Sequence, residues 1–129
     1  MPRRRRLSQV AARWGQTNIT EIDPQRYDID FWRTHWRRTR VQGVIINAGG
    51  IVAYYPSGLP LAYQAEFLNG RDLFGELVAA ARADGLAVLA RMDSNRVHED
   101  VFAAHPDWIA RNAAGQPYRL VQGPRGGGR

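Results

Sequence analysis

Polar residues stand where three short apolar runs of this 129-residue chain end. Carboxylate, amide and guanidinium groups in such places can bind a polar substrate, and carboxylates can also transfer protons. Turns and helix caps favour Asp, Asn and Ser at the same places, so both interpretations stay open. The candidates are Glu21 and Asp23 after the first run, Asn47, Gly49 and Gly50 after the second, and Arg91, Asp93, Ser94 and Asn95 after the third.

Arg91 and Asp93 are two residues apart, so their side chains project to the same face if the chain stays extended. A guanidinium that emerges from an apolar strand is costly to bury unless a carboxylate pairs with it. The spacing therefore indicates either a substrate cleft or a structural Arg–Asp pair.

Tyr54 and Tyr55 lie in a long connection that is rich in Gly and Pro. Aromatic faces in a cleft can stack on the apolar face of a sugar ring, while the hydroxyl groups bond its edges. Alternatively, both rings pin the loop to the rest of the domain. Neither interpretation excludes the other.

Metal and cofactor sites are not predicted. His98, Glu99, Asp100 and His105 form neither a His-x-x-x-His nor a Glu-x-x-His pattern. The chain contains no cysteine and no lysine, which excludes disulfides, thiolate zinc sites, cysteine nucleophiles and all lysine chemistry. No G-x-G-x-x-G sequence follows the first run, which disfavours dinucleotide binding there.

The formal charge of +6 is carried by the two ends of the chain. Residues 7–119 hold twelve arginines and twelve acidic residues, so their net charge is zero. The excess lies in Arg3–Arg6, Arg125 and Arg129, within tails whose composition predicts disorder. We therefore expect no nucleic-acid surface in the fold, and a basic arm that binds nucleic acid or an acidic partner is an alternative only.

Short apolar runs alternate with amphipathic stretches between these tails. We predict strands at 17–22, 43–47 and 87–91, helices at 28–40 and 72–84, a short helix at 98–104 and a turn at 112–115. In the first helix the spacing places four side chains on the apolar side: Phe31, Trp32, His35 and Trp36.

A strand–helix–strand–helix–strand series predicts an α/β fold with a parallel sheet. An open doubly wound sheet and a (β/α)₈ barrel both fit this order. A whole barrel takes about 250 residues, so three strands would be only its first part.

Four stretches carry a shared pattern: residues 13–21, 43–57, 72–76 and 90–93. Together they resemble the start of the family called hypothetical glycosyl hydrolase 6. Residues 105–108 followed by 115–117 are similar to a segment found widely in sugar-cleaving barrels after the third strand. The resemblance covers roughly residues 13 to 119.

The resemblance implies a (β/α)₈ TIM barrel that acts on carbohydrate, with relatives among fucosidase-like and β-galactosidase-like barrels. Glycoside hydrolysis normally needs two carboxylates, which in comparable barrels lie on strand four and later strands. We therefore expect the chain to be a truncated barrel that consists of the first three βα units. By itself it should bind carbohydrate but not hydrolyse it. The expected substrate-binding residues are Asn47, Tyr54, Tyr55, Arg91, Asp93 and His98.

The predicted organisation is a basic arm at 1–12, a partial barrel at 13–119 and a Gly/Arg-rich tail at 120–129. Open sheet edges predict self-association. A non-catalytic remnant that binds sugar is the second alternative. No run approaches the length of a membrane span, and no export signal follows the arginines, so we expect a cytoplasmic protein without a membrane partner.

Overall fold

The computed structural model describes residues 6–119. The chain divides into two compact units, Met1–Val97 and His98–Arg129. Arg3–Arg5 and the predicted tail at 120–129 lie outside the described residues. The elements are α1 (Leu7–Val10), β1 (Trp14–Thr17), η1 (Asp23–Gln25), α2 (Ile29–Thr39), β2 (Gly43–Gly50), α3 (Leu73–Ala83), β3 (Ala87–Asp93), α4 (Glu99–Ala104) and η2 (Pro106–Trp108).

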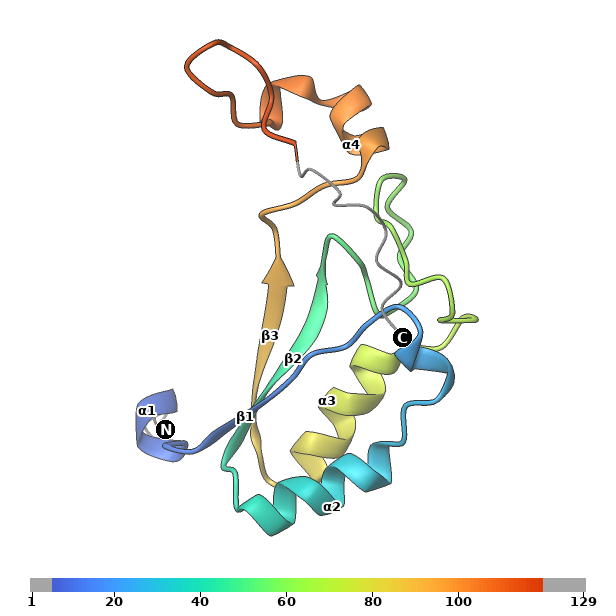
Figure 1. Ribbon diagram of the computed structural model, residues 1–129. Helices are drawn as coiled ribbons and strands as arrows, with labels where there is room; N and C mark the ends of the chain where they lie inside the picture. The colour runs from blue at the N-terminus through green and yellow to red at the C-terminus, as the bar shows by residue number, and fades with distance from the viewer. Residues whose placement is uncertain (1–5, 120–129) are drawn as a thin grey trace, which may run out of the picture. The chain divides into compact units, whose positions relative to one another are not determined.

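The first unit is built on a three-stranded parallel sheet with the order β1-β2-β3, which confirms the predicted α/β class (Figure 1). β1 pairs with the first half of β2, from Trp14 opposite Gly43 to Thr17 opposite Ile46. β3 runs along the whole of β2. Parallel pairing brings the carboxyl ends of the strands to one edge of the sheet.

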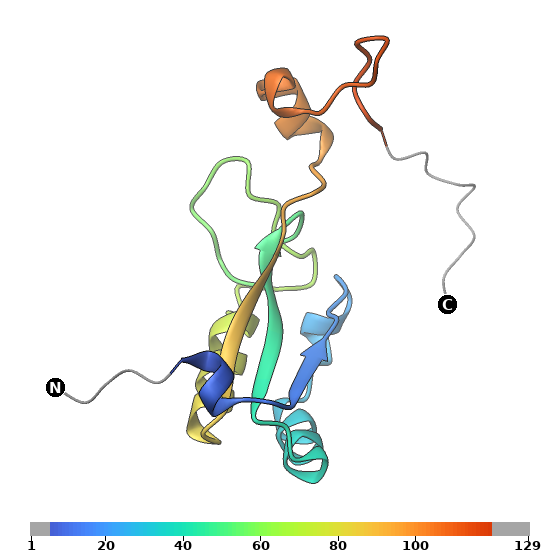
Figure 2. The ribbon, with the colours of Figure 1, turned by 90° about the vertical axis from the view of Figure 1, so that its left-hand side faces the viewer.

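Helices α2 and α3 cover the same face of this sheet, as Figures 1 and 2 show. Between them and β2 lies the hydrophobic core, where six side chains are almost completely buried: Trp36, Val44, Ile46, Leu73, Leu77 and Ala81. Burying such side chains contributes about 1.5–3 kcal/mol each for the large aliphatic ones. The other face of β2 remains available for polar groups.

Helix α2 begins where the sequence predicts it, because the Asp28 carboxylate accepts a hydrogen bond from the Phe31 backbone amide at 3.1 Å. The prediction that Phe31 faces the core is wrong, since its side chain is 61% exposed. Ile29, Trp32 and Trp36 instead pack on the core, a spacing of three and four residues that rotates Phe31 outward.

Helix α3 has the predicted ends. The Asp72 carboxylate caps it by accepting from the Gly75 amide at 2.8 Å. Gly85 follows the helix with φ +73°, the left-handed conformation that only glycine adopts without strain. The chain can therefore turn at once into β3.

The first strand lies earlier than predicted, at Trp14–Thr17 instead of 17–22. Pairing with β2 fixes it there, and the Trp14 ring packs over Gly43, whose missing Cβ would lie 2.6 Å from that ring. Ile19 is still buried, but in a loop that leaves the sheet. The alternating pattern of 17–22 therefore corresponds to burial of Thr17 and Ile19, and only Thr17 of these two lies in a strand.

Part of the predicted basic arm is ordered, contrary to the expected disorder. Leu7–Val10 forms helix α1, and Ala11 is buried. The Trp14 indole N–H donates to the Ala11 carbonyl at 3.2 Å, and the backbone amides that follow bond the Gln42 side chain. Hydrogen bonds to the distant Gln42 hold this segment against the rest of the unit, and amino-acid composition cannot predict such bonds.

The second unit contains α4, η2 and a turn. An antiparallel bridge pairs Arg111 with Pro117, and Gly115 makes the predicted turn with φ +76°. None of the helices within residues 6–119 is long and apolar enough to cross a membrane.

Candidate functional site

A polar network lies at the carboxyl edge of the sheet, on the face that α2 and α3 do not cover. The register places Asn47 opposite Arg91, and Arg91 and Asp93 project to one face of β3. Asn18 lies one residue beyond β1. Each of the three strands therefore supplies a polar side chain to the same edge.

Arg91 is the centre of this network. Its Nε and Nη2 atoms lie 3.0 and 2.9 Å from Oδ1 of Asp93, and its Nη1 donates to Asn18 Oδ1 at 2.7 Å. Gln16 donates to the same Asn18 oxygen at 2.9 Å. The Arg–Asp pair predicted from the spacing is confirmed, and it is part of a larger arrangement.

Asn47 joins the network from the central strand. Its Nδ2 lies 3.4 Å from Oδ2 of Asp93, and its side chain is only 7% exposed. The Asp93 carboxylate fixes the orientation of the amide, because the opposite orientation would set two acceptors against each other. Oδ1 of Asn47 is then buried without a hydrogen-bond partner among the described residues.

A bulge between Asn47 and Gly49 lets β2 and β3 meet closely at this edge. Gly50 has φ +103°, and a Cβ at this residue would overlap the backbone of Asp93. The Ile51 amide donates to the Asp93 carbonyl at 3.0 Å. Gly50 therefore allows the two backbones to approach closely, which helps to position Asp93.

Tyr54 pins the β2–α3 loop to the loop after β1. Its hydroxyl donates to the Ile19 carbonyl at 2.6 Å, and its side chain is 5% exposed. Burial raises the pKa of Tyr54 to about 12, and nearby carboxylates add to this. The ring faces of Tyr54 are covered, which matches the loop-pinning interpretation.

Tyr55 is more accessible than Tyr54. Its ring lies 6.3 Å from the Phe74 ring, and its hydroxyl lies 3.5 Å from where a Cβ of Gly49 would be. The absence of a side chain at Gly49 therefore leaves room for the Tyr55 hydroxyl near the carboxyl edge.

Sequence reasoning did not find three contributors to this edge: Gln16, Asn18 and Tyr63. The Tyr63 hydroxyl donates to Glu21 Oε2 at 3.0 Å, and this hydrogen bond raises the pKa of Tyr63. Gln16, Asn18 and Tyr63 reach this edge only through contacts between segments that are far apart in the sequence. The one available signal was the polar composition of the residues around 16–21.

His98 begins the second unit, as the residue before α4. Its predicted place in the substrate cleft stays a prediction. Within the described residues, no three His, Asp or Glu side chains lie together in a way that could hold a metal ion.

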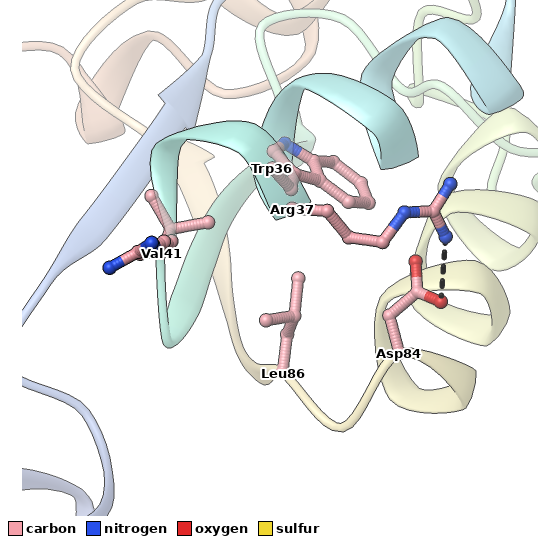
Figure 3. Close-up of a pocket in the computed structure, with 6 residues that line it drawn as sticks. Trp36, Arg37, Val41, Asp84 and Leu86 are labelled. Carbon is pink, nitrogen blue, oxygen red and sulfur yellow. Dashed lines mark ion pairs between the residues drawn. The ribbon is translucent and has the colours of Figure 1, made fainter.

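A cavity of about 190 Å³ lies at the opposite end of the sheet (Figure 3). Val41 and Leu86, which precede β2 and β3, line it together with Trp36. Arg37 and Asp84 form an ion pair of 3.5 Å across it. Because the strands begin here, the cavity is separate from the carboxyl-edge network.

Two solved structures are similar to this chain. Alpha-L-fucosidase isoenzyme 2 from Paenibacillus thiaminolyticus matches with a TM-score of 0.64 and 21% identity over 80% of this chain. A bacterial fucosidase with a monovalent iminocyclitol inhibitor matches with a TM-score of 0.45 and 25% identity over 52% of the chain. In both cases the match spans 16% of the fucosidase chain.

The first of these structures shares the fold of this chain. No curated protein sequence matches the chain significantly. The sequence pattern of the family Hypothetical glycosyl hydrolase 6 matches residues 33–126, which is well over half of the chain and includes β2, α3 and β3. The chain therefore belongs to the hypothetical glycosyl hydrolase 6 family.

Proposed function

We propose that this chain forms the first three βα units of a glycoside hydrolase barrel and supplies part of its carbohydrate-binding cleft. The observation that carries the proposal is the network of Asn18, Asn47, Arg91 and Asp93 at the carboxyl edge of a parallel sheet. In (β/α)₈ barrels, the active site is built at this edge.

The arrangement of the layers supports a barrel. Both helices that follow a strand lie on one face of the sheet, whereas an open doubly wound sheet has helices on both faces. The uncovered face carries Ile45 and Leu89 below the polar network. Leu89 is 39% exposed, as expected for an inward side chain of an unfinished barrel.

The chemistry of the network fits a sugar. A pyranose offers several hydroxyl groups that both donate and accept, and this edge presents carboxylate and amide acceptors beside guanidinium donors. Tyr55 lies close enough to the same edge to contribute a ring or a hydroxyl. We assign substrate contact to Asn47, Tyr55, Arg91 and Asp93, with Tyr54 holding the loop in place.

Asp93 does not supply the pair of carboxylates that hydrolysis requires. Oδ1 of Asp93 accepts from Arg91 and Oδ2 lies 3.4 Å from the amide nitrogen of Asn47, and these contacts orient the carboxylate for binding. A glycosidase needs a second carboxylate about 5–10 Å away as acid, base or nucleophile. We therefore propose that this chain binds carbohydrate and that the catalytic carboxylates belong to the later strands of the whole protein.

Titration of the ¹⁵N-labelled chain with methyl α-L-fucopyranoside and methyl β-D-galactopyranoside tests this proposal. We expect at least one of these sugars to shift the side-chain amide resonances of Asn47. The variant Asp93→Ala should abolish the shift, while the matched control Asp30→Ala, an exposed acid on α2, should keep it. Unchanged Asn47 resonances with both of these sugars, and also with methyl glucoside and methyl mannoside, would contradict the proposed site.

An assay of the same chain with aryl glycosides tests the absence of catalysis. We expect no release of the aryl group above the rate in buffer. Turnover that disappears in Asp93→Asn would overturn the assignment of Asp93 to binding alone.

A further inference from the structure

The second unit contains an aromatic pair that the carboxyl-edge site does not use. The rings of His105 and Trp108 are stacked, with centroids 3.8 Å apart and planes inclined by only 5°. The Trp108 side chain is nevertheless 66% exposed. We propose that Trp108 is a platform on which a sugar ring stacks, an inference that rests on the proposed carbohydrate function.

The geometry of the pair leaves one face of the indole available. Because the imidazole of His105 covers one face, the exposed area of Trp108 must lie on the other face and on the ring edges. Pro106 and η2 hold the two residues in one turn, in which the Trp108 amide donates to the His105 carbonyl at 3.1 Å. The ring is thus fixed before a ligand binds, which lowers the entropic cost of stacking.

The surroundings of Trp108 favour a sugar over a protein partner. None of the described residues of the second unit, 98–119, is buried, and charged side chains are frequent among them: Glu99, Asp100, Asp107, Arg111 and Arg119. The centre of a protein interface is depleted of charge and extends over many apolar side chains. A pyranose instead needs a single flat ring under its C–H face and polar groups around its rim.

A second exposed ring lies in the same segment. Tyr118 is 69% exposed. Its backbone amide donates at 3.0 Å to the carbonyl of Ala110, a residue that follows Trp108 by two positions. The bridge between Arg111 and Pro117 holds these two stretches together. The second unit therefore presents two aromatic side chains on a short framework made of backbone hydrogen bonds.

Phe31 provides a matched control. Its side chain is 61% exposed, but the Trp32 ring meets it edge-on at 87°, so Trp32 does not back a flat face of Phe31. Exposure alone therefore does not distinguish Trp108 from Phe31, whereas the coplanar backing ring does.

The test is the indole N–H resonance of Trp108 in the ¹⁵N-labelled 129-residue chain, assigned by comparison with Trp108→Phe. Titration with methyl β-D-galactopyranoside and methyl α-L-fucopyranoside should shift this resonance, and saturation of the indole protons should transfer to the sugar C–H protons. Trp108→Ala should weaken the transfer at least about tenfold, Trp108→Phe should retain most of it, and Phe31→Ala should leave it unchanged.

The outcomes separate this inference from the proposed edge site. Shifts at Asn47 without any at Trp108 overturn the platform and leave the edge site intact, whereas shifts at Trp108 alone overturn the edge site. If neither residue responds, both proposals are wrong. If Trp108→Ala does not keep the circular dichroism spectrum of the unchanged chain, His105→Ala is the second variant to measure. It removes only the ring that backs Trp108 and should weaken the saturation transfer to the sugar. An undiminished saturation transfer would overturn the role of the stacked pair.

Discussion

Tyr54 illustrates how one residue type can serve either binding or architecture. From its neighbours in sequence, Tyr54 is as good a sugar-stacking candidate as Tyr55. In the structure Tyr54 is buried and its hydroxyl donates to the Ile19 carbonyl, while Tyr55 lies near the carboxyl edge of the sheet. At the scale of the residue, the decisive quantity is the hydrogen-bond partner, because a buried hydroxyl that is already paired cannot also serve a ligand.

Titration of buried tyrosines should make the chain sensitive to alkaline pH. Burial raises the pKa of both Tyr27 and Tyr54 from 10.0 to about 12. A raised pKa means that the folded state holds the proton more tightly, so this stabilisation is fully present below pH 10 and is lost as the pH rises toward 12. We expect the free energy of unfolding, measured in urea, to fall over this range.

The variant Tyr54→Phe should reduce that alkaline loss by about half, because Tyr27 retains its own share. At neutral pH the same variant should destabilise the chain by about 1–2 kcal/mol, since it leaves the Ile19 carbonyl unpaired. Tyr55→Phe is the control, with an expected change below about 0.5 kcal/mol. Equal effects of the two variants would argue against the pinning role of Tyr54.

At the scale of the element, connections between helices and strands position the site. Arg71 binds Glu76 through two nitrogens and also donates to the Pro24 carbonyl, which ties the β2–α3 loop to the β1–α2 connection. At the other end, Arg33 of α2 binds both carboxylate oxygens of Asp84 after α3, at 2.9 and 2.7 Å. The end of α3 is therefore joined to the middle of α2, at the end of the sheet opposite the polar network.

The Arg33–Asp84 pair should support stability only above acidic pH. Its hydrogen bonds hold the pKa of Asp84 below the usual 3.8. A lowered pKa stabilises the fold above pH about 4, and the stabilisation is lost as the pH falls through the folded-state value. Asp84→Asn should therefore lower the Tm at pH 7 and have little further effect near pH 2, whereas Asp30→Asn, at a 90% exposed side chain, should change the Tm less at pH 7.

The bulge at the end of β2 gives a sharper element-scale prediction. Gly50→Ala should destabilise the chain by more than about 2 kcal/mol, because φ is +103° and a Cβ would overlap the Asp93 backbone. Gly58→Ala, where a Cβ meets nothing within 4 Å, should change stability by less than about 0.5 kcal/mol. Urea denaturation followed by circular dichroism measures both, and similar midpoints would contradict the constraint at Gly50.

At the scale of the whole molecule, the described sheet has three strands, with β1 and β3 as its outer members. Leu89 and Met92 of β3 are 39% and 57% exposed. A strand edge with exposed apolar side chains favours pairing with another chain. The chain also spans 16% of the length of the fucosidase chain whose fold it shares.

We predict that the isolated 129-residue chain self-associates through β3. Leu89→Lys should shift sedimentation toward the monomer by placing a charge beside the open edge. Leu59→Lys, at a 70% exposed loop residue, is the matched control and should leave the association unchanged. A monomer at all concentrations, or an equal response to both variants, would contradict this role of β3.

The sequence by itself determined the types of the main elements, the bounds of the two long helices and the polar strand ends, because periodicity and the residues that end a helix act within a few residues. It misplaced the first strand, and it set Phe31 in the core. Both errors concern long-range packing: β1 is fixed by pairing with β2, and the rotation of α2 is fixed by the core beneath it.

Tertiary structure alone decided which candidate residues meet. Asn47, Arg91 and Asp93 converge because parallel strands carry their carboxyl ends to one edge, and Asn18 and Gln16 join them across β1. Tyr54 is not among the proposed substrate-binding residues, because its loop folds back and its hydroxyl donates to the Ile19 carbonyl. Residue types limit what a side chain can do, but its partners are set by contacts between segments that lie tens of residues apart, which local sequence does not encode.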